Sequence, residues 1–133
     1  MAVSLSTHDT GQALIFPVFS AAEGNDSLIS ILQDIDLARG TKAVKVRFIA
    51  GDDGRDLASF NVYLKRGATW TASISAQNGL TQIVSPGESC TYPLPVEGIQ
   101  AEFDAAIGYV EVIEMGVVST FSVKELVDTG DCA

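Results

Sequence analysis

The chain has 133 residues, the length of a single domain, since one hydrophobic core serves chains of up to about 250 residues. Hydrophobic residues make up 47% and charged residues 19%, a composition that excludes an intrinsically disordered chain. The formal net charge of −9 argues against nucleic-acid binding, because an acidic surface repels phosphate backbones. This charge indicates either a surface for a basic partner or ordinary solubility.

Residues 1–10 are predicted to form an extended leader, which contains the single histidine, His8. A general base needs a fixed partner, which chain termini rarely provide, so we expect His8 to be solvated and not catalytic. No secretion signal is visible in the first twenty residues. No window approaches the roughly 20 apolar residues of a membrane span.

The segment Ala13 to Phe19 is predicted to be the first strand, with Leu14, Phe16 and Val18 on one face. Pro17 cannot donate a backbone hydrogen bond, which predicts an edge strand or a bulge. The run Leu28 to Leu32, LISIL, is apolar at nearly every position and predicts a strand covered on both faces.

The stretch Lys42 to Leu64 predicts a hairpin, because two alternating strands flank the acidic turn Gly51 to Gly54. A calcium site at this turn is the alternative, but Asp52, Asp53 and Asp56 do not reproduce the spacing of known calcium loops. We therefore interpret the turn as a hairpin tip.

A second hairpin is predicted around Asn78 and Gly79, which join a strand containing Trp70 to a strand from Leu80 to Val84. Trp70 shares its alternation with apolar neighbours and is predicted to lie in the core. The proline-rich stretch Ser85 to Pro95 is predicted to be irregular, with at most a short strand around Cys90 to Tyr92.

The segment Ile107 to Met115 is predicted to be the last strand. Its Glu111 and Glu114 are three positions apart, so they should lie on opposite faces unless a bulge intervenes. In the tail, residues 121–133, Ser122 and Glu125 have the spacing of a capping box and predict a short helical turn.

About seven short strands separated by turn signals predict an all-β fold over residues 11–120. The expected architecture is a two-sheet antiparallel sandwich, because each sheet must bury its apolar face against another layer. A small β-barrel is the alternative.

Cys90 and Cys132 lie far apart in the sequence, with no CxxC spacing and no nearby histidine, which argues against a zinc site. In an exported protein the two would form a disulfide that ties the tail to the body; two unrelated thiols are the alternative. We predict no metal and no cofactor, and the sequence contains no nucleophile elbow or phosphate-binding loop. Paired acids drawn from Glu111, Glu114 or Asp104 are the remaining catalytic hypothesis.

Aromatic side chains allow a second hypothesis, a stacking platform for a sugar. Its members would be Tyr63, Trp70, Tyr92 and Tyr109. The alternation of its strand points Tyr63 outward, so Tyr63 and Tyr92 are the predicted surface contacts.

Five segments carry a resemblance through their order and spacing. They are GQALIFPVFS (11–20), LISIL (28–32), KAVKVRF (42–48), FNVYL (60–64) with Trp70 shortly after, and GYVEVIEMG (108–116). Together they resemble the N-terminal region of a group of uncharacterised exported proteins of Gram-negative bacteria. The resemblance implies an immunoglobulin-like sandwich, a signal peptide upstream, and residence in the periplasm or on the cell surface. It implies no activity and carries over no catalytic residue.

These observations favour a non-enzymatic, extracytoplasmic domain with a structural or protein-interaction role. An exposed sheet edge would serve for self-association or for binding a protein partner. A carbohydrate-binding module is the alternative.

Overall fold

The computed structural model describes residues 13–33, 41–65, 67–85, 90–93 and 95–118. Within them the chain forms a short 3-10 helix and nine strands: β1 (Ala13–Ser20), η1 (Ala22–Gly24), β2 (Ser27–Leu32), β3 (Thr41–Ala50), β4 (Asp56–Leu64), β5 (Thr69–Gln77), β6 (Leu80–Val84), β7 (Thr91–Tyr92), β8 (Ile99–Phe103) and β9 (Ile107–Val118). His8, Cys132, the predicted leader and the predicted helical turn of the tail lie outside the described residues.

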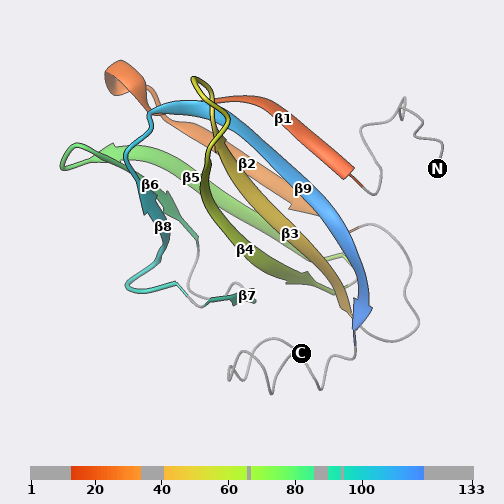
Figure 1. Ribbon diagram of the computed structural model, residues 1–133. Coiled ribbons are helices and arrows are strands. Elements are labelled where there is room, and N and C mark those ends of the chain that lie inside the picture. Colours follow the sequence, from red (N-terminus) through yellow and green to blue (C-terminus); the bar gives the residue numbers. More distant parts are fainter. Residues whose placement is uncertain (1–12, 34–40, 66, 86–89, 94, 119–133) are drawn as a thin grey trace.

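The strands form two antiparallel sheets that stack as layers (Figure 1). One sheet has five strands in the order β1-β9-β3-β4-β7, and the other has four in the order β2-β5-β6-β8. Each sheet buries its apolar face against the other. The predicted two-sheet β-sandwich is therefore confirmed.

Both predicted hairpins are present. β3 and β4 pair across the acidic turn, with Val44 opposite Val62 and Val46 opposite Phe60. β5 and β6 pair across Asn78 and Gly79, whose φ angles of 53° and 82° are both positive. Two positive φ angles in a two-residue loop match the twist of the flanking strands, which is why Asn-Gly is favoured there.

Aromatic rings from five strands form the centre of the core. Phe19 of β1 packs edge-on against Phe48 of β3 with 5.6 Å between ring centroids. Phe60 of β4 likewise packs against Trp70 of β5 at 5.5 Å, and Phe103 of β8 lies 5.9 Å from both Phe19 and Phe48. Trp70 is buried as predicted. These rings connect the two sheets directly.

β1 is an edge strand, as Pro17 predicts, and it also contains a bulge between Phe16 and Phe19. The extra residue reverses the alternation after Phe16. Val18, predicted to share the inner face of Leu14 and Phe16, is instead 69% exposed, and Phe19 enters the core. That part of the prediction was wrong because a bulge moves all later side chains to the other face.

The segment LISIL forms β2, but its predicted burial on both faces is wrong. Ile29 and Ile31 are buried, whereas Leu28 and Leu32 are 71% and 60% exposed. β2 lies at the edge of the four-stranded sheet, and no described residues form a layer over its outer face. Continuous apolarity here does not mark two-sided burial.

The strand β8 was not predicted. Ala101 and Phe103 of this strand pack in the core, but a bulge in its pairing with β6 interrupts the alternation, and the strand is only five residues long. Glu97 and Gly98, which precede β8, have positive φ angles and form the turn that leads into the strand. No helix in the described part of the chain is long and apolar enough to span a membrane.

Candidate functional site

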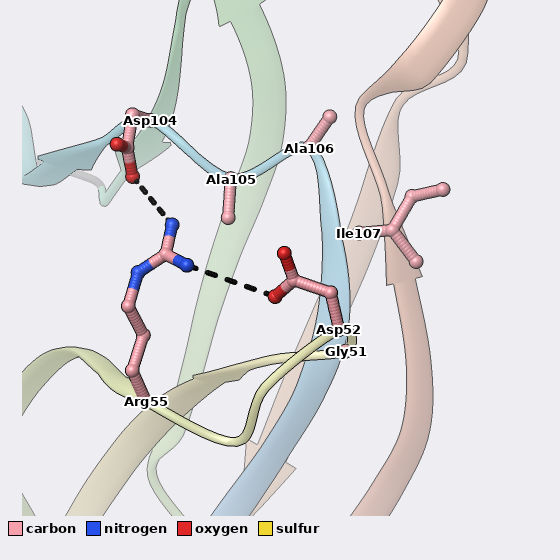
Figure 2. A pocket seen from close by; sticks show the side chains of 7 residues that line it. All are labelled: Gly51, Asp52, Arg55, Asp104, Ala105, Ala106 and Ile107. Carbon is pink, nitrogen blue, oxygen red and sulfur yellow. Dashed lines mark hydrogen bonds and ion pairs between the residues drawn. The ribbon is translucent and has the colours of Figure 1, made fainter.

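The tip of the β3–β4 hairpin borders an open hollow of about 500 Å³ (Figure 2). The segment that joins β8 to β9 forms its other side. The lining residues are Gly51, Asp52, Arg55, Asp104, Ala105, Ala106 and Ile107. The hollow therefore lies between the β3–β4 turn of the five-stranded sheet and the segment that crosses from β8, in the four-stranded sheet, to β9, in the five-stranded sheet.

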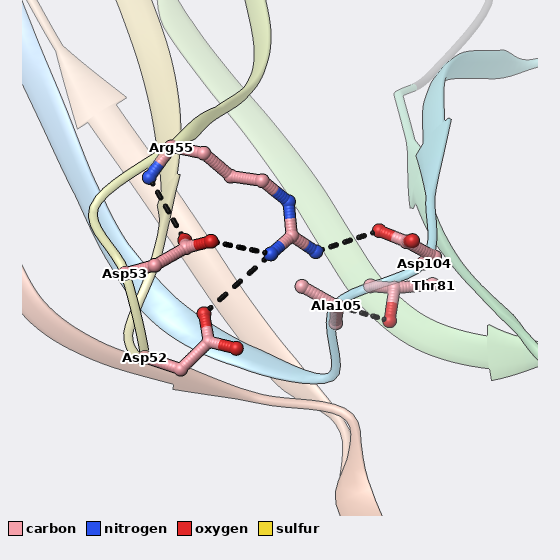
Figure 3. Close-up of polar contacts among 6 residues, drawn as sticks. All are labelled: Asp52, Asp53, Arg55, Thr81, Asp104 and Ala105. Carbon is pink, nitrogen blue, oxygen red and sulfur yellow. Dashed lines mark hydrogen bonds and ion pairs between the residues drawn. The ribbon is translucent and has the colours of Figure 1, made fainter.

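Arg55 is held by three carboxylates in this hollow (Figure 3). Its guanidinium lies 2.9 Å from Asp104, 3.0 Å from Asp53 and 3.7 Å from Asp52. The hydrogen bonds to Asp104 and Asp53 raise the pKa of Arg55. Asp53 accepts from the backbone N–H of Arg55 at 3.1 Å and from its guanidinium, which together lower the pKa of that carboxyl.

The crossing from β8 to β9 is further fixed by hydrogen bonds from three other segments. The hydroxyl of Thr81 donates to the carbonyl of Ala105 at 2.8 Å, and the amide of Ala21 donates to the carbonyl of Ala106 at 2.8 Å. The amide of Gly51 donates to the carbonyl of Ile107 at 3.1 Å. We call the ion-paired group of Arg55, Asp52, Asp53 and Asp104 the corner clamp. In it, Arg55 connects the tip of the β3–β4 hairpin to the segment between β8 and β9.

This geometry does not make a calcium loop. Asp52 and Asp53 bind Arg55, while Asp56 forms an ion pair with Arg47. The described part of the chain contains no group of three or more potential ligand side chains placed to hold a metal ion. The interpretation of the turn as a hairpin tip therefore agrees with the structure.

The acids proposed for hydrolysis lie apart. Glu111 is opposite Arg47 on the outer face of β9 and pairs with it at 3.0 Å. Glu114 is opposite Val44, whose side chain faces the core, and it lies 3.6 Å from Lys42. The two carboxylates thus occupy opposite faces of the strand, as predicted. Asp104 belongs to the corner clamp.

The aromatic platform is not assembled as predicted. Trp70 is in the core, and Tyr63 is buried with only 8% of its surface exposed. Tyr63 does face away from the core, but Ala43, Cys90 and Val118 pack around it. The predicted exposure of Tyr63 was therefore wrong, because alternation identifies a face and not what covers it.

Tyr92 is exposed, as predicted, and lies opposite Asn61 on the neighbouring strand. Asn61 donates to the hydroxyl of Tyr63 at 3.5 Å. The carbonyl of Cys90 accepts from the amide of Tyr63 at 2.9 Å, which fixes the segment before β7 to β4. Cys132 lies outside the described residues, so its pairing with Cys90 stays a prediction.

Each of the two sheets formed by the described residues has two edge strands, and these four strands differ in their protection against pairing with another strand. β1 contains Pro17 and a bulge, and β7 is two residues long and followed by Pro93. β8 bears Glu102 and is flanked by a bridge from Val96 to Ile99. Such devices are how natural proteins protect their edges.

β2 has none of these devices. Its six residues, SLISIL, include no proline, glycine or charged residue, and it pairs with β5 in unbroken register. No other described strand pairs with it. Sequence reasoning found the strand but not its edge position, because pairing order is invisible in a local pattern.

Comparison with known proteins gives no match: no family model, no curated protein and no solved structure resembles this chain significantly.

Proposed function

We propose that this protein is a non-catalytic interaction domain that binds a protein strand along the open edge of β2. The observation that carries the proposal is this edge: its six residues are uncharged, no described strand pairs with its outer side, and Leu28 and Leu32 of the strand are largely exposed. An extended segment added to such an edge forms main-chain hydrogen bonds, and neighbouring apolar side chains add specificity.

The contrast with the corner clamp supports this choice of site. Every charged group that lines the hollow is already ion-paired within the domain. A ligand there would have to displace the acids from Arg55. β2, by comparison, would gain contacts on binding and lose none to described residues.

We also propose that the domain works outside the cytoplasm. A disulfide between Cys90 and Cys132 would support this, because disulfides form and persist in oxidising environments outside the cytoplasm. Thiol titration of the denatured, unreduced protein should then find no free thiol. Two free thiols in protein purified from its native compartment would contradict the proposal.

Site-specific photo-crosslinking in the native cell tests the edge directly. A photoreactive residue placed at Leu28 or Leu32 should give discrete protein adducts. The matched control is Val18, which is equally exposed, at 69%, but lies on the protected β1 edge. Adducts at β2 and not at Val18 would support strand addition, whether the captured chain is this protein or another. Equal adducts at all three positions, or none at β2, would overturn it.

A further inference from the structure

We infer that the strand bound by β2 is β2 of a second copy, paired antiparallel about a two-fold axis at Ser30. This inference rests on the proposed function and names its partner. It would join the two four-stranded sheets into one continuous sheet across a closed, symmetric dimer.

The backbone N–H and C=O groups of β2 point in the directions that this pairing requires. Gln33, the residue after β2, donates its N–H to Ala68 and accepts at its carbonyl from Gly67, so its polar groups face β5. Backbone polar groups alternate in direction along a strand. Those of Ile29 and Ile31 therefore also face β5, while those of Leu28, Ser30 and Leu32 face outward.

Outward groups at 28, 30 and 32 are self-complementary about Ser30. Ser30 pairs with its own copy, and Leu28 pairs with Leu32 of the other copy on both sides of the axis. Three hydrogen-bonded residue pairs result, with about six main-chain hydrogen bonds. No backbone group used in this way is needed by β5.

The side chains have the same symmetry, because residues 28–32 read LISIL in both directions. Pairing about Ser30 places exposed Leu28 beside exposed Leu32 and buried Ile29 beside buried Ile31. Directly opposed residues share a face, so the inner faces of both sheets stay continuous. A shift by two residues would instead place a leucine opposite Ser30.

Ser30 suits a position on a symmetry axis, where each side chain meets its own copy. A charged residue would repel itself there, and a large one would clash. The hydroxyl of Ser30 hydrogen-bonds to that of Thr71 at 2.9 Å, which holds the side chain toward β5 and away from the axis. The axis is left clear for main-chain pairing.

The overall charge gives this dimer a diagnostic salt dependence. Two copies with a net charge of −9 repel one another, while β2 itself is uncharged. Screening by salt should therefore strengthen the dimer. Binding of a basic partner to an acidic surface would weaken with salt instead. One strand pair makes a small interface, so we expect a reversible dimer with a dissociation constant on the order of 0.1 mM.

Sedimentation equilibrium of the full chain from about 10 µM to 1 mM tests the inference. Ser30→Pro removes the outward N–H at the axis without removing a hydrogen bond to β5, and prolines are tolerated on edge strands in this orientation. It should raise the dissociation constant at least about tenfold. Ser30→Ala, the matched control, removes the same hydroxyl but keeps the N–H and should change it less than about threefold.

Charge pairs then test the register. Leu28→Lys combined with Leu32→Lys places like charges opposite one another, and so does the double substitution to Glu; each variant should be monomeric. A mixture of the two should form heterodimers. Leu28→Lys with Leu32→Glu should form homodimers, because each lysine then faces a glutamate of the other copy. Circular dichroism confirms that each variant is folded.

A monomeric wild type at 1 mM would overturn the inference, as would a dimer that Ser30→Pro leaves intact or doubly basic and doubly acidic variants that do not pair. The proposed function would survive these outcomes if crosslinks at Leu28 and Leu32 still captured a different protein. It would fail with the inference if those positions captured nothing.

Discussion

The first two strands of this domain, β1 and β2, both lie at sheet edges and are treated in opposite ways. β1 carries Pro17 and a bulge, which remove a donor and bend the strand away from regular pairing. β2 follows after a short turn and keeps a regular, uncharged, apolar edge. An edge strand that no described strand covers is an aggregation hazard, and this contrast with β1 is the reason why we propose that β2 pairs with another strand.

The largest expected effect concerns the contact between β1 and β9, where the ring of Phe19 packs closely on Gly108. A Cβ added at Gly108 would lie 2.1 Å from the carbonyl oxygen of Ile49 and 2.7 Å from the ring of Phe19. Gly108→Ala should therefore destabilise the domain by about 3 kcal/mol or more, since a backbone atom cannot move aside easily.

Chemical denaturation measures this effect. Gly24→Ala is the control: it has a positive φ of 80° but open space around it, and should cost about 1 kcal/mol. Equal losses for both variants would show that Phe19 does not pack on Gly108 as described.

The next largest effect is a difference in stability between substitutions on the two faces of β2. Ile31 is buried and Leu32 is 60% exposed. At concentrations where the protein is monomeric, Ile31→Ala should cost about 2 kcal/mol of unfolding free energy, and Leu32→Ala less than about 0.5 kcal/mol. Urea denaturation of both variants checks the contrast, which would fail if Leu32→Ala cost as much as Ile31→Ala.

The corner clamp should be independent of the β2 edge and should show the smallest effect, one that depends on pH. Arg55 lowers the pKa of Asp53, so the folded state favours the ionised carboxylate. The resulting stabilisation is present above the ordinary pKa of an aspartate, about 3.9, and is lost as pH falls through the lowered value.

Arg55→Met removes the ion pair but keeps the backbone hydrogen bond to Asp53. Melting temperatures of wild type and variant should differ by a small, constant amount between about pH 5 and 7, and the two should converge below about pH 4. Dimerisation should not change. A difference that grows toward low pH would contradict this account of the clamp.

Much of the fold was predictable because regular alternation identifies which face of a strand packs in the core. The strands that contain Val46, Phe60 and Trp70 alternate regularly, and Asn78-Gly79 identifies its hairpin without further context. Predictions failed where a local pattern depends on distant parts of the chain. The bulge after Phe16 turned the side chain of Val18 to the outer face. Tyr63 is buried because Val118 of β9 and Cys90 pack against it.

The edge position of β2 could not be predicted from a local pattern either. The palindrome of residues 28–32 is visible in the sequence, but its position at a sheet edge follows only from the pairing order of both sheets. The partners of Arg55 were equally hidden, since Asp104 is far from it in the sequence. Long-range pairing therefore decides which predicted elements become sites.

Residue-resolved amide hydrogen exchange along β2 tests the open edge most directly. In dilute protein, the amides of Ile29 and Ile31 should be protected and those of Leu28, Ser30 and Leu32 should exchange rapidly. Concentrated protein should protect all five. Protection of Leu28, Ser30 and Leu32 already in the dilute monomer would show that the edge is covered by its own chain, and would contradict the account.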